Sequence, residues 1–445
     1  SSLIEQISGV GKIEFLDTLH KDEFLLGEVK FTNMQLIEKA EVDPSSPWTR
    51  TALLGVIAAK QAVIDSGVNL DNAALVSAST VGGMDRSEIY YKDFLSDAIH
   101  RNYIDSHHAG NSTEMIAEQC GFGGLITTVS TACSSSLNSI MFGARLIKNG
   151  IAKTAVVGGT DALSKFTLNG FNTLMILDKE LCRPFDRTRL GLNLGEGAAY
   201  LVLEDLETAI LSGKHIYAEV SGYANSNDAH HQTASSENGE GPFLAMSRAL
   251  DSANLKPSDI DYINAHGTGT DNNDLTEGKA ILRLFGENIP AFSSTKAFTG
   301  HTLGAAGVIE SVISILSLNN SVVPPNINFS ATIDELGITP VTRLTKLDSF
   351  NHVLTNSFGF GGNDSSLIFS TSDTAHQTNN GDIITKKSSP VYITGASSIS
   401  PQDTFENKAF LDEVVDSNDR FLQILKPNYR KFINPKLLRR MSKIV

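Results

Sequence analysis

Short apolar runs and longer amphipathic stretches alternate along most of the chain. Apolar runs of the length of buried strands occur at Ala73–Ala78, Ala155–Gly159, Tyr200–Glu204, Tyr217–Gly222, Tyr262–Ala265, Ala291–Ser294, Val353–Asn356 and Ser366–Ser370. Stretches with apolar residues at helical spacing occur at Thr51–Ser66, Thr113–Cys120, Ser136–Lys148, Gly241–Ala253, Asp274–Phe285 and Ala306–Leu318. Because such alternation favours sheets covered by helices, the pattern predicts an α/β fold.

A cysteine stands where a predicted strand turns into a predicted helix. Cys133, in TACSSS, follows the apolar run LITTVSTA and precedes SSSLNSIMFGARLI. Free N–H groups and the positive end of the helix dipole meet at such a position. They predict a thiol pKa below the usual value of about 8.5 and a nucleophilic thiolate. On the local sequence alone, a buried structural cysteine is an equally good interpretation.

Two histidines lie in segments rich in glycine. His266, in NAHGTGTDNND, follows an apolar run and opens a turn whose Thr268 and Thr270 offer hydroxyl groups to a ligand. His301, in TKAFTGHTLGAAG, lies between Lys296 and Glu310, two ionisable groups in an otherwise apolar region. Such groups are rarely buried unless they are paired. The alternatives are a turn-capping histidine at 266 and a surface salt bridge near 301.

In this order and spacing, the three segments resemble the β-ketoacyl–acyl carrier protein synthases of the thiolase superfamily, in their elongating Cys-His-His branch. The resemblance spans about residues 5–370 and extends to the segments VVGGTDA, CRPFDRTRLGLNLGEGAAYLVLE, PPNINF and TNSFGFGGNDSSLIF. It implies a thiolase-like fold, with two similar halves in a five-layered α-β-α-β-α arrangement. Cys133 would lie in the N-terminal half, residues 1–210. His266 and His301 would lie in the C-terminal half, residues 211–372.

The resemblance also implies a decarboxylating Claisen condensation. Cys133 would take an acyl group from a carrier protein, with the backbone N–H groups of Cys133 and Phe360 as the oxyanion hole. His266 and His301, as neutral N–H donors, would hold the thioester oxygen of a malonyl–carrier protein as it loses CO₂. The product would be a β-ketoacyl–carrier protein, in fatty-acid, polyketide or aryl-polyene chain elongation.

Further residues receive supporting roles from the same resemblance. Lys296 paired with Glu310 would tune the histidines, and Phe360 would act as a gate for the acyl chain. The remaining substrate-binding positions are Thr268, Thr270, Phe358 and Gly359. No metal ion and no cofactor of its own are expected, because the substrates arrive on the phosphopantetheine arm of the carrier protein.

Two segments depart from the common family pattern. The loop after the gate reads GGND, with Asn363 and Asp364, where many fatty-acid members have GGTN. GLNLGEGAA also departs from the usual GFVxGEGAG. These variants are similar to the ketosynthases of aryl-polyene and type II polyketide pathways.

Two alternatives to this enzyme class stay open. One is a thiolase-type acyltransferase, which typically carries a second active cysteine near the C-terminus; none follows His301. The other is a non-catalytic chain-length factor in a ketosynthase heterodimer, and such partners usually lack the cysteine that stands here at position 133.

Composition limits the partners and the compartment. The net charge of −14 is unfavourable for nucleic-acid binding, which needs a basic surface. Three cysteines suit a reducing cytoplasm rather than a disulfide framework, and no apolar run predicts a membrane span. The expected partners are acyl carrier protein and either a second copy or a ketosynthase-like chain-length partner in a dimer. Because carrier protein is acidic, its docking would need local basic residues, for which the candidates are Lys165, Arg183, Arg187 and Arg189.

The C-terminal part has a different pattern. Residues 373–390 are polar and predict a linker, and residues 391–445 resemble the start of a second synthase-like unit. The family's opening strand is not recognisable near Ser1, where the resemblance starts inside the family pattern. We therefore expect the segment at about Ser389–Ser400, whose part Val391–Ile399 is apolar and alternating, to supply that strand, in the same chain or to a neighbouring one. The alternative is a tandem of two synthase units.

Overall fold

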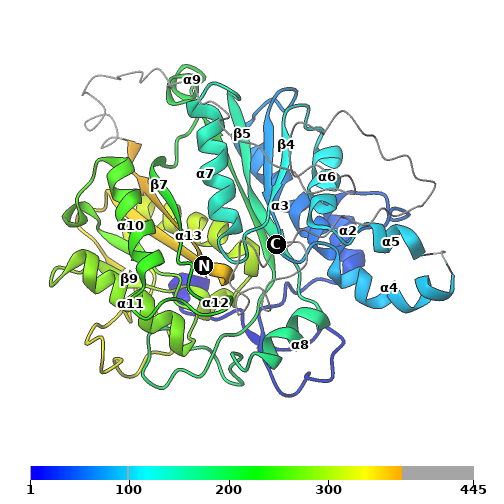
Figure 1. Cartoon of the computed structure of the whole chain (residues 1–445). Coiled ribbons are helices and arrows are strands. Elements are labelled where there is room, and N and C mark those ends of the chain that lie inside the picture. Colours follow the sequence, from blue (N-terminus) through cyan, green and yellow to red (C-terminus); the bar gives the residue numbers. More distant parts are fainter. Residues whose placement is uncertain (1, 98–99, 373–445) are drawn as a thin grey trace, which may run out of the picture. The chain divides into compact units, whose positions relative to one another are not determined.

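The computed structural model describes residues 2–97 and 100–372 (Figure 1). Its internal contacts group Ser1–Gly381 into one compact unit and Asp382–Val445 into a second. The predicted linker at 373–390 and the predicted synthase-like segment at 391–445 lie outside the described residues.

Two sheets form the framework of the first unit. The first sheet has the strand order β4 (Ile126–Val129), β3 (Ala74–Ala78), β5 (Thr154–Asp161) and β6 (Gly197–Glu204). The second has the order β7 (Glu219–Asn227), β13 (Asn363–Ser370), β12 (His352–Gly359), β8 (Tyr262–Asn264) and β9 (Ala291–Ser293). In the first sheet β3 runs parallel to β4 and β5, and β6 is antiparallel to β5. In the second, β8 runs parallel to β9 and β12, and β13 is antiparallel to β12.

Helices form the other three layers, as Figure 1 shows. The middle helices are α7 (Ser135–Lys148) and α13 (Ala306–Asn320), and their Leu137 and Val308 share one apolar core with residues of both sheets. The first sheet is covered on its outer face by α3 (Arg50–Ser66) and α6 (Ala109–Cys120). The second is covered by α10 (Glu240–Ala253) and α11 (Asp271–Phe285). The expected five-layered α-β-α-β-α arrangement is confirmed.

The remaining elements are short connections or peripheral helices. The helices are α1 (Ser2–Glu5), α2 (Asn33–Ala40), α4 (Met84–Ser96), α5 (Arg101–Asp105), α8 (Lys165–Thr173), α9 (Leu206–Leu211) and α12 (Lys296–Thr299). Two strand pairs, β1 (Gly11–Lys12) with β2 (Leu25–Leu26) and β10 (Val322–Val323) with β11 (Thr345–Lys346), complete the described elements together with three 3₁₀ turns.

The apolar pattern located the core elements but not the peripheral ones. Among the described side chains of α4, only Ser87 is buried, so this helix packs no apolar stripe against the core. Strand β7 runs on to Asn227, beyond the predicted Gly222, because its polar second half pairs with β13 up to Asn363.

One described helical stretch, Leu303–Asn320, is apolar and long enough to cross a membrane by length and composition. About 72% of it is buried inside the fold, where α13 forms part of the middle layer. A helix that packs between two sheets needs apolar residues all round, just as a membrane-spanning helix does. The stretch therefore has the character of a core helix.

Candidate active site

Cys133 occupies a sharp turn between β4 and α7. The preceding Ala132 has a left-handed backbone with φ of 53°, which is costly for a residue other than glycine. The side chain of Ser135 holds this turn: its hydroxyl donates to the carbonyl of Ala132 at 2.5 Å and accepts from the N–H of Thr131 at 2.8 Å. Cys133 thereby stands immediately before the first turn of α7, as the sequence predicted.

The predicted low pKa of the Cys133 thiol is wrong. Burial raises this pKa to about 11, because only 7% of the residue is exposed. The charge of Lys296 and the backbone N–H groups of Phe360 and Cys133 all favour the thiolate, but desolvation outweighs them. The resting nucleophile is therefore a neutral thiol surrounded by groups arranged to accept negative charge.

His266 follows β8 on a turn held by two buried carboxylates of α11. Glu277 accepts hydrogen bonds from the N–H groups of His266 and Gly267, at 2.9 and 2.8 Å. Asp274 accepts from the N–H groups of Thr268 and Gly269. The N–H groups of this turn are thus satisfied by side chains that follow it in the sequence, so the histidine ring has a fixed position.

Lys296 lies buried behind His266. Its Nζ donates to Nδ1 of His266 at 3.1 Å, to the His266 carbonyl at 2.6 Å and to Oε1 of Glu310 at 2.5 Å. Both members of the Lys296–Glu310 pair are nearly inaccessible to solvent. The surface salt bridge considered from the sequence is therefore excluded, and Lys296 with Glu310 forms a buried ion pair beside the candidate histidine.

His301 contacts the nucleophile directly. Its Nε2 lies 3.1 Å from Sγ of Cys133, and its Nδ1 accepts a hydrogen bond from the N–H of Leu303 at 3.3 Å. Burial and the charge of Lys296 hold the pKa of His301 well below its usual value, and the same causes, together with His301, act on the pKa of His266. Both rings are therefore neutral, and their Nδ1 atoms accept hydrogen bonds, which leaves an N–H on each Nε2.

The three predicted residues come together although they are far apart in the sequence. Their ligating atoms all lie within 4.8 Å of one another, and the two histidine rings are 5.3 Å apart. Such spacing would also allow a metal ion, but a thiol of raised pKa and two N–H donors suit a substrate oxygen better. The absence of a metal stays a prediction.

The loop after β12 closes over the cysteine. Gly359 is so close to the turn that a Cβ atom there would lie 3.0 Å from the carbonyl of Thr131 and 3.2 Å from the nitrogen of Cys133. The ring of Phe360 stacks on that of Phe171 with centroids 5.9 Å apart, and the buried Phe358 ring lies 5.9 Å from that of His266. Phe358, Gly359 and Phe360 therefore lie beside the cysteine–histidine cluster, and their roles as gate and substrate-binding positions stay predictions.

The two threonines of the turn after His266 contact each other. The hydroxyls of Thr268 and Thr270 are 2.9 Å apart. Arg189, one of the candidate docking residues, is buried and donates to the backbone carbonyls of Thr270 and Asp271. It therefore supports this turn rather than a docking surface. The other candidates, Lys165, Arg183 and Arg187, form ion pairs with Asp17, Asp178 and Asp334.

Sequence reasoning missed one supporting carboxylate. Asp161, at the end of β5, is buried and accepts hydrogen bonds from the hydroxyls of Ser79 and Thr80 and from the N–H of Gly304. It ties the end of the first sheet to the segment that carries His301. Its position in VVGGTDA was a signal, because a carboxylate directly after a buried strand must find partners.

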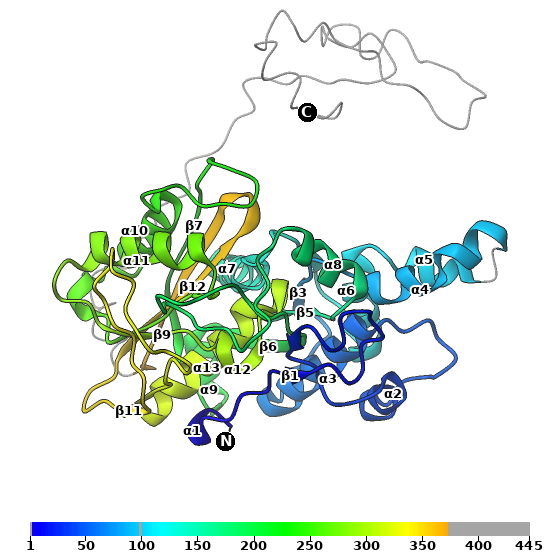
Figure 2. The same ribbon diagram turned by 90° about the horizontal axis from the view of Figure 1, so that it is seen from below.

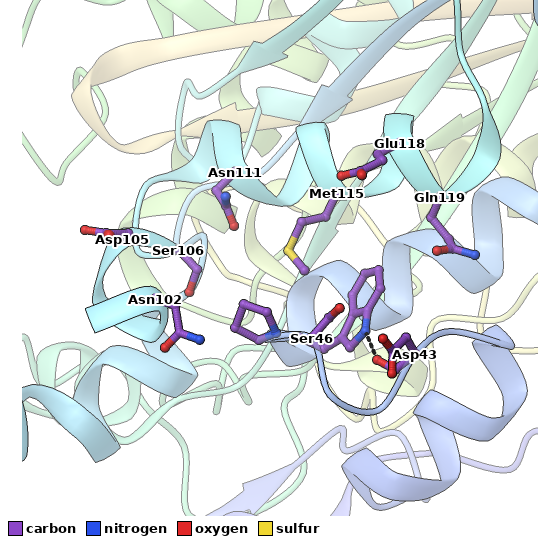
Figure 3. Close-up of a pocket in the computed structure, with 11 residues that line it drawn as sticks. Asp43, Ser46, Asn102, Asp105, Ser106, Asn111, Met115, Glu118 and Gln119 are labelled. Atoms are coloured by element: carbon purple, nitrogen blue, oxygen red, sulfur yellow. Dashed lines mark hydrogen bonds between the residues drawn. The ribbon is translucent and has the colours of Figure 1, made fainter. Parts of the chain in front are cut away.

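A separate pocket of about 390 Å³ lies near α5 and α6 and is shown in Figure 3. It is lined by Trp48 and Met115 together with polar and acidic side chains, including Asp43, Asp105 and Glu118. Because it shares no residue with the Cys133–His266–His301 cluster, we do not assign it to the acyl substrate.

Comparison with known proteins agrees with this geometry. Residues 30–209 match the family described as "Beta-ketoacyl synthase, N-terminal domain", and residues 217–330 match "Beta-ketoacyl synthase, C-terminal domain". The 3-oxoacyl-[acyl-carrier-protein] synthase 2 of Staphylococcus aureus is 34% identical over 383 residues, covering 82% of this chain and 92% of that protein. The protein of the same name from Vibrio cholerae is 36% identical over 392 residues, covering 83% and 93%.

Solved structures extend the likeness. The ishigamide ketosynthase/chain length factor superposes with a TM-score of 0.78 at 31% identity, covering 83% of this chain and 93% of that one. A ketosynthase in complex with its chain length factor from Xenorhabdus doucetiae gives a TM-score of 0.71 at 31% identity, covering 83% and 92%. With both domains matched and the cysteine–histidine cluster assembled, the chain belongs to the β-ketoacyl synthase family.

Proposed function

We propose that this protein is an elongating β-ketoacyl–acyl carrier protein synthase that condenses an acyl group on Cys133 with a malonyl–carrier protein. The observation that carries the proposal is the approach of His301 Nε2 to within 3.1 Å of the Cys133 sulfur. The backbone N–H groups of Phe360 and Cys133 act on the same sulfur. Two sets of N–H donors, the backbone pair and the histidines, therefore lie beside one nucleophile. Two successive thioester reactions require this, because each develops negative charge on a different oxygen.

In the first half-reaction, the sulfur of Cys133 attacks the thioester carbonyl of an acyl–carrier protein. The N–H groups of Cys133 and Phe360 stabilise the tetrahedral oxyanion. When the intermediate collapses, the carbon–sulfur bond to the carrier breaks, and the departing thiolate takes the proton that the cysteine thiol gives up. Because that thiol starts neutral, no net charge remains in the buried site.

In the second half-reaction, malonyl–carrier protein binds with its thioester oxygen on the Nε2–H groups of His266 and His301. Cleavage of the bond to the carboxylate releases CO₂ and leaves an enolate whose charge these two donors stabilise. The enolate carbon attacks the acyl carbonyl, the bond to Cys133 breaks, and one proton from solvent restores the thiol. Lys296 holds His266 in the tautomer that donates. No resident cofactor or metal is needed, because the carrier's phosphopantetheine arm presents both substrates to Thr268, Thr270, Phe358 and Gly359.

The partners follow from the same reaction and from the relatives. Acyl carrier protein is the substrate carrier. Dimerisation is favoured by the edge strand β4, at whose start Ile126 and the preceding Leu125 are 41% and 45% exposed. Two similar structures contain a ketosynthase together with a chain length factor. Through this edge, the protein would form either a homodimer or a heterodimer with such a partner. The protein would act in the cytoplasm, where fatty-acid or polyketide carrier proteins are found.

An assay with purified protein tests the proposal. Incubation with acyl- and malonyl–carrier protein should release CO₂ and add one acyl group to Cys133, seen by intact mass. Cys133→Ala should abolish acylation, whereas His301→Ala should still acylate but fail to condense. A chelator in a parallel reaction should change nothing. Missing acylation of the unaltered protein would favour the inert chain-length factor, and condensation without CO₂ release would favour the thiolase-type acyltransferase.

A further inference from the structure

The carboxylate of Asp161, at the end of β5, is buried and accepts hydrogen bonds on both of its oxygens. Its Oδ1 accepts from the hydroxyl of Ser79 at 2.7 Å and from the N–H groups of Thr80 and Val81 at 3.0 and 3.2 Å. Its Oδ2 accepts from the hydroxyl of Thr80 at 2.6 Å and from the N–H of Gly304 at 2.7 Å. Partners from β3, from the segment after it and from the segment after His301 therefore fix this side chain in one place.

The N–H group of Gly304 belongs to a strained turn that directly follows His301. Leu303 has a left-handed backbone with φ of 53°, which is unfavourable for a leucine. The 3₁₀ turn Leu303–Ala305 then leads into α13, which lies beside β5 and β6 (Figure 2). Such a backbone conformation persists only where its surroundings hold it. The hydrogen bond from Gly304 to Asp161 is one of the contacts that hold it.

This turn controls the ring of His301. The N–H of Leu303 donates to Nδ1 of His301 at 3.3 Å, so the ring proton stands on Nε2, which lies 3.1 Å from Sγ of Cys133. The backbone of His301 is held independently, because its N–H donates to the carbonyl of Asn193 and its carbonyl accepts from the N–H of Gly195. A change in the turn should therefore alter the protonation site of the ring before it alters the position of the backbone.

The turn and the carboxylate are in close contact. A Cβ atom at Gly304 would lie 2.8 Å from Oδ2 of Asp161 and 3.1 Å from Cγ2 of Thr80, and the first of these distances is closer than a methyl group tolerates. Glycine at this position lets the backbone approach the carboxylate. The contact can therefore be broken from either side, by removing the carboxylate or by adding one methyl group to the turn.

We propose that Asp161 is a positioning residue that fixes the tautomer of His301, as Lys296 fixes that of His266. The inference rests on the proposed function, in which the Nε2–H groups of both histidines hold the thioester oxygen of the malonyl group. The two rings are oriented by different means. Lys296 donates directly to the ring of His266. Asp161 acts on the ring of His301 through the backbone of the turn.

Two variants break the contact from its two sides, Asp161→Ala and Gly304→Ala. In each, His301 should show a mixture of ring tautomers, read from the nitrogen chemical shifts of isotope-labelled histidines, while His266 keeps its proton on Nε2. The signals of His301 are identified by their loss in His301→Ala. Condensation should fall about tenfold or more, because the Nε2–H donor is present in only part of the molecules. Acylation of Cys133, followed by intact mass, should change less than about threefold, since its oxyanion is held by backbone N–H groups.

Thr80→Val is the matched control. It removes a hydroxyl that donates to the same Oδ2 of Asp161, but it leaves the N–H of Gly304 on that oxygen. The tautomer of His301 and the rate of condensation should therefore stay as in the unaltered protein.

Two results would overturn the assignment. If Thr80→Val changed the tautomer of His301 as much as Gly304→Ala, the hydrogen bonds of Asp161 would serve the fold alone. A single Nε2–H tautomer of His301 in Gly304→Ala would show that Asp161 does not control the ring, even if Asp161→Ala failed to fold. The proposed function is judged separately: it fails if the unaltered protein does not condense, whereas the chemical shifts still decide whether Asp161 sets the tautomer.

Discussion

Nζ of Lys296 donates a hydrogen bond to Nδ1 of His266 over 3.1 Å, and this contact determines which ring nitrogen carries the proton. An ammonium group can only donate, so the neutral ring must hold its hydrogen on Nε2. A buried ion pair with Glu310 keeps Lys296 in place, and burial raises the pKa of Glu310 to about 7. The lysine is therefore a positioning residue that acts through the histidine.

Lys296→Met should separate the two half-reactions. We expect condensation to fall about 100-fold, because the tautomer of His266 is no longer fixed. Acylation of Cys133 should continue, and single-turnover mass spectrometry can follow both steps. The single variant should also lose about 3–5 kcal/mol of stability, since Glu310 is left buried without its partner.

The double variant Lys296→Met/Glu310→Gln is the matched control. It removes the stranded charge and should recover most of the lost stability, as measured by denaturant unfolding. Condensation should stay low. Recovery of condensation together with stability would mean that the pair only supports the fold.

The raised pKa of Cys133 predicts how the thiol reacts with a small neutral alkylating agent. Below a pKa of about 11, the thiolate fraction grows about tenfold per pH unit. The modification rate of the Cys133 peptide should therefore rise without a plateau between about pH 7 and 9. A plateau in this range would show that the helix terminus and Lys296 outweigh burial. Peptide mapping separates this signal from those of Cys120 and Cys182.

Asp364 makes stability depend on pH. Burial first, then the charges of Asp228 and Glu277, raise the pKa of this carboxyl to about 8. The unfolded chain ionises near pH 4, so between about pH 4 and 8 the unfolded state releases a proton that the native state keeps. This group's contribution to stability is therefore lost as pH rises through that window.

Asp364→Asn should remove this effect. We expect a gain on the order of 1–4 kcal/mol at pH 7 and almost none at pH 4, measured by thermal or denaturant unfolding at both pH values. Asp251→Asn, at an exposed carboxylate of α10, should leave the pH dependence unchanged. A loss of stability at pH 7 in Asp364→Asn would contradict the raised pKa.

Asn363 connects the gate loop to the nucleophile turn. Its Oδ1 accepts hydrogen bonds from Ser134 Oγ at 2.7 Å, from Asn138 Nδ2 at 2.9 Å and from Asn225 Nδ2 at 2.8 Å. Asn363→Ala removes an acceptor that three donors share, at a cost of about 0.5–1.5 kcal/mol. The cost stays small because each donor keeps another acceptor, at Thr131 or Ser365. We expect acylation to slow about tenfold, because Phe360 loses its fixed relation to Cys133.

Two further variants show whether the acceptor is what matters. Asn363→Asp keeps an acceptor for all three donors and should retain most of the acylation rate. Asn225→Ala removes one donor and should cost less than Asn363→Ala in stopped-flow acylation. An equal loss in all three variants would assign Asn363 to packing alone.

The sequence predicted the core of the fold because buried elements carry a strong apolar pattern. It also located Cys133, His266 and His301, since small residues and glycines mark places of close approach. It did not predict the sign of the pKa shift at Cys133, because residues that contact Cys133, Ser357 of β12 and His301, are remote in the chain. Asp161 was missed for the same reason: its partners at Ser79 and Gly304 become neighbours only in the folded unit.

The middle layer of α7 and α13 has a consequence for dissecting this protein. Each helix buries apolar side chains against both sheets, so neither of the predicted halves, 1–210 or 211–372, owns a complete core. Expressed alone, each half would expose a helix face as apolar as its interior, and we expect it to be insoluble. Coexpressed, the two fragments should find each other and restore condensation, since every group of the candidate site is supplied by one or the other. The site itself could then serve as a reporter of fragment assembly.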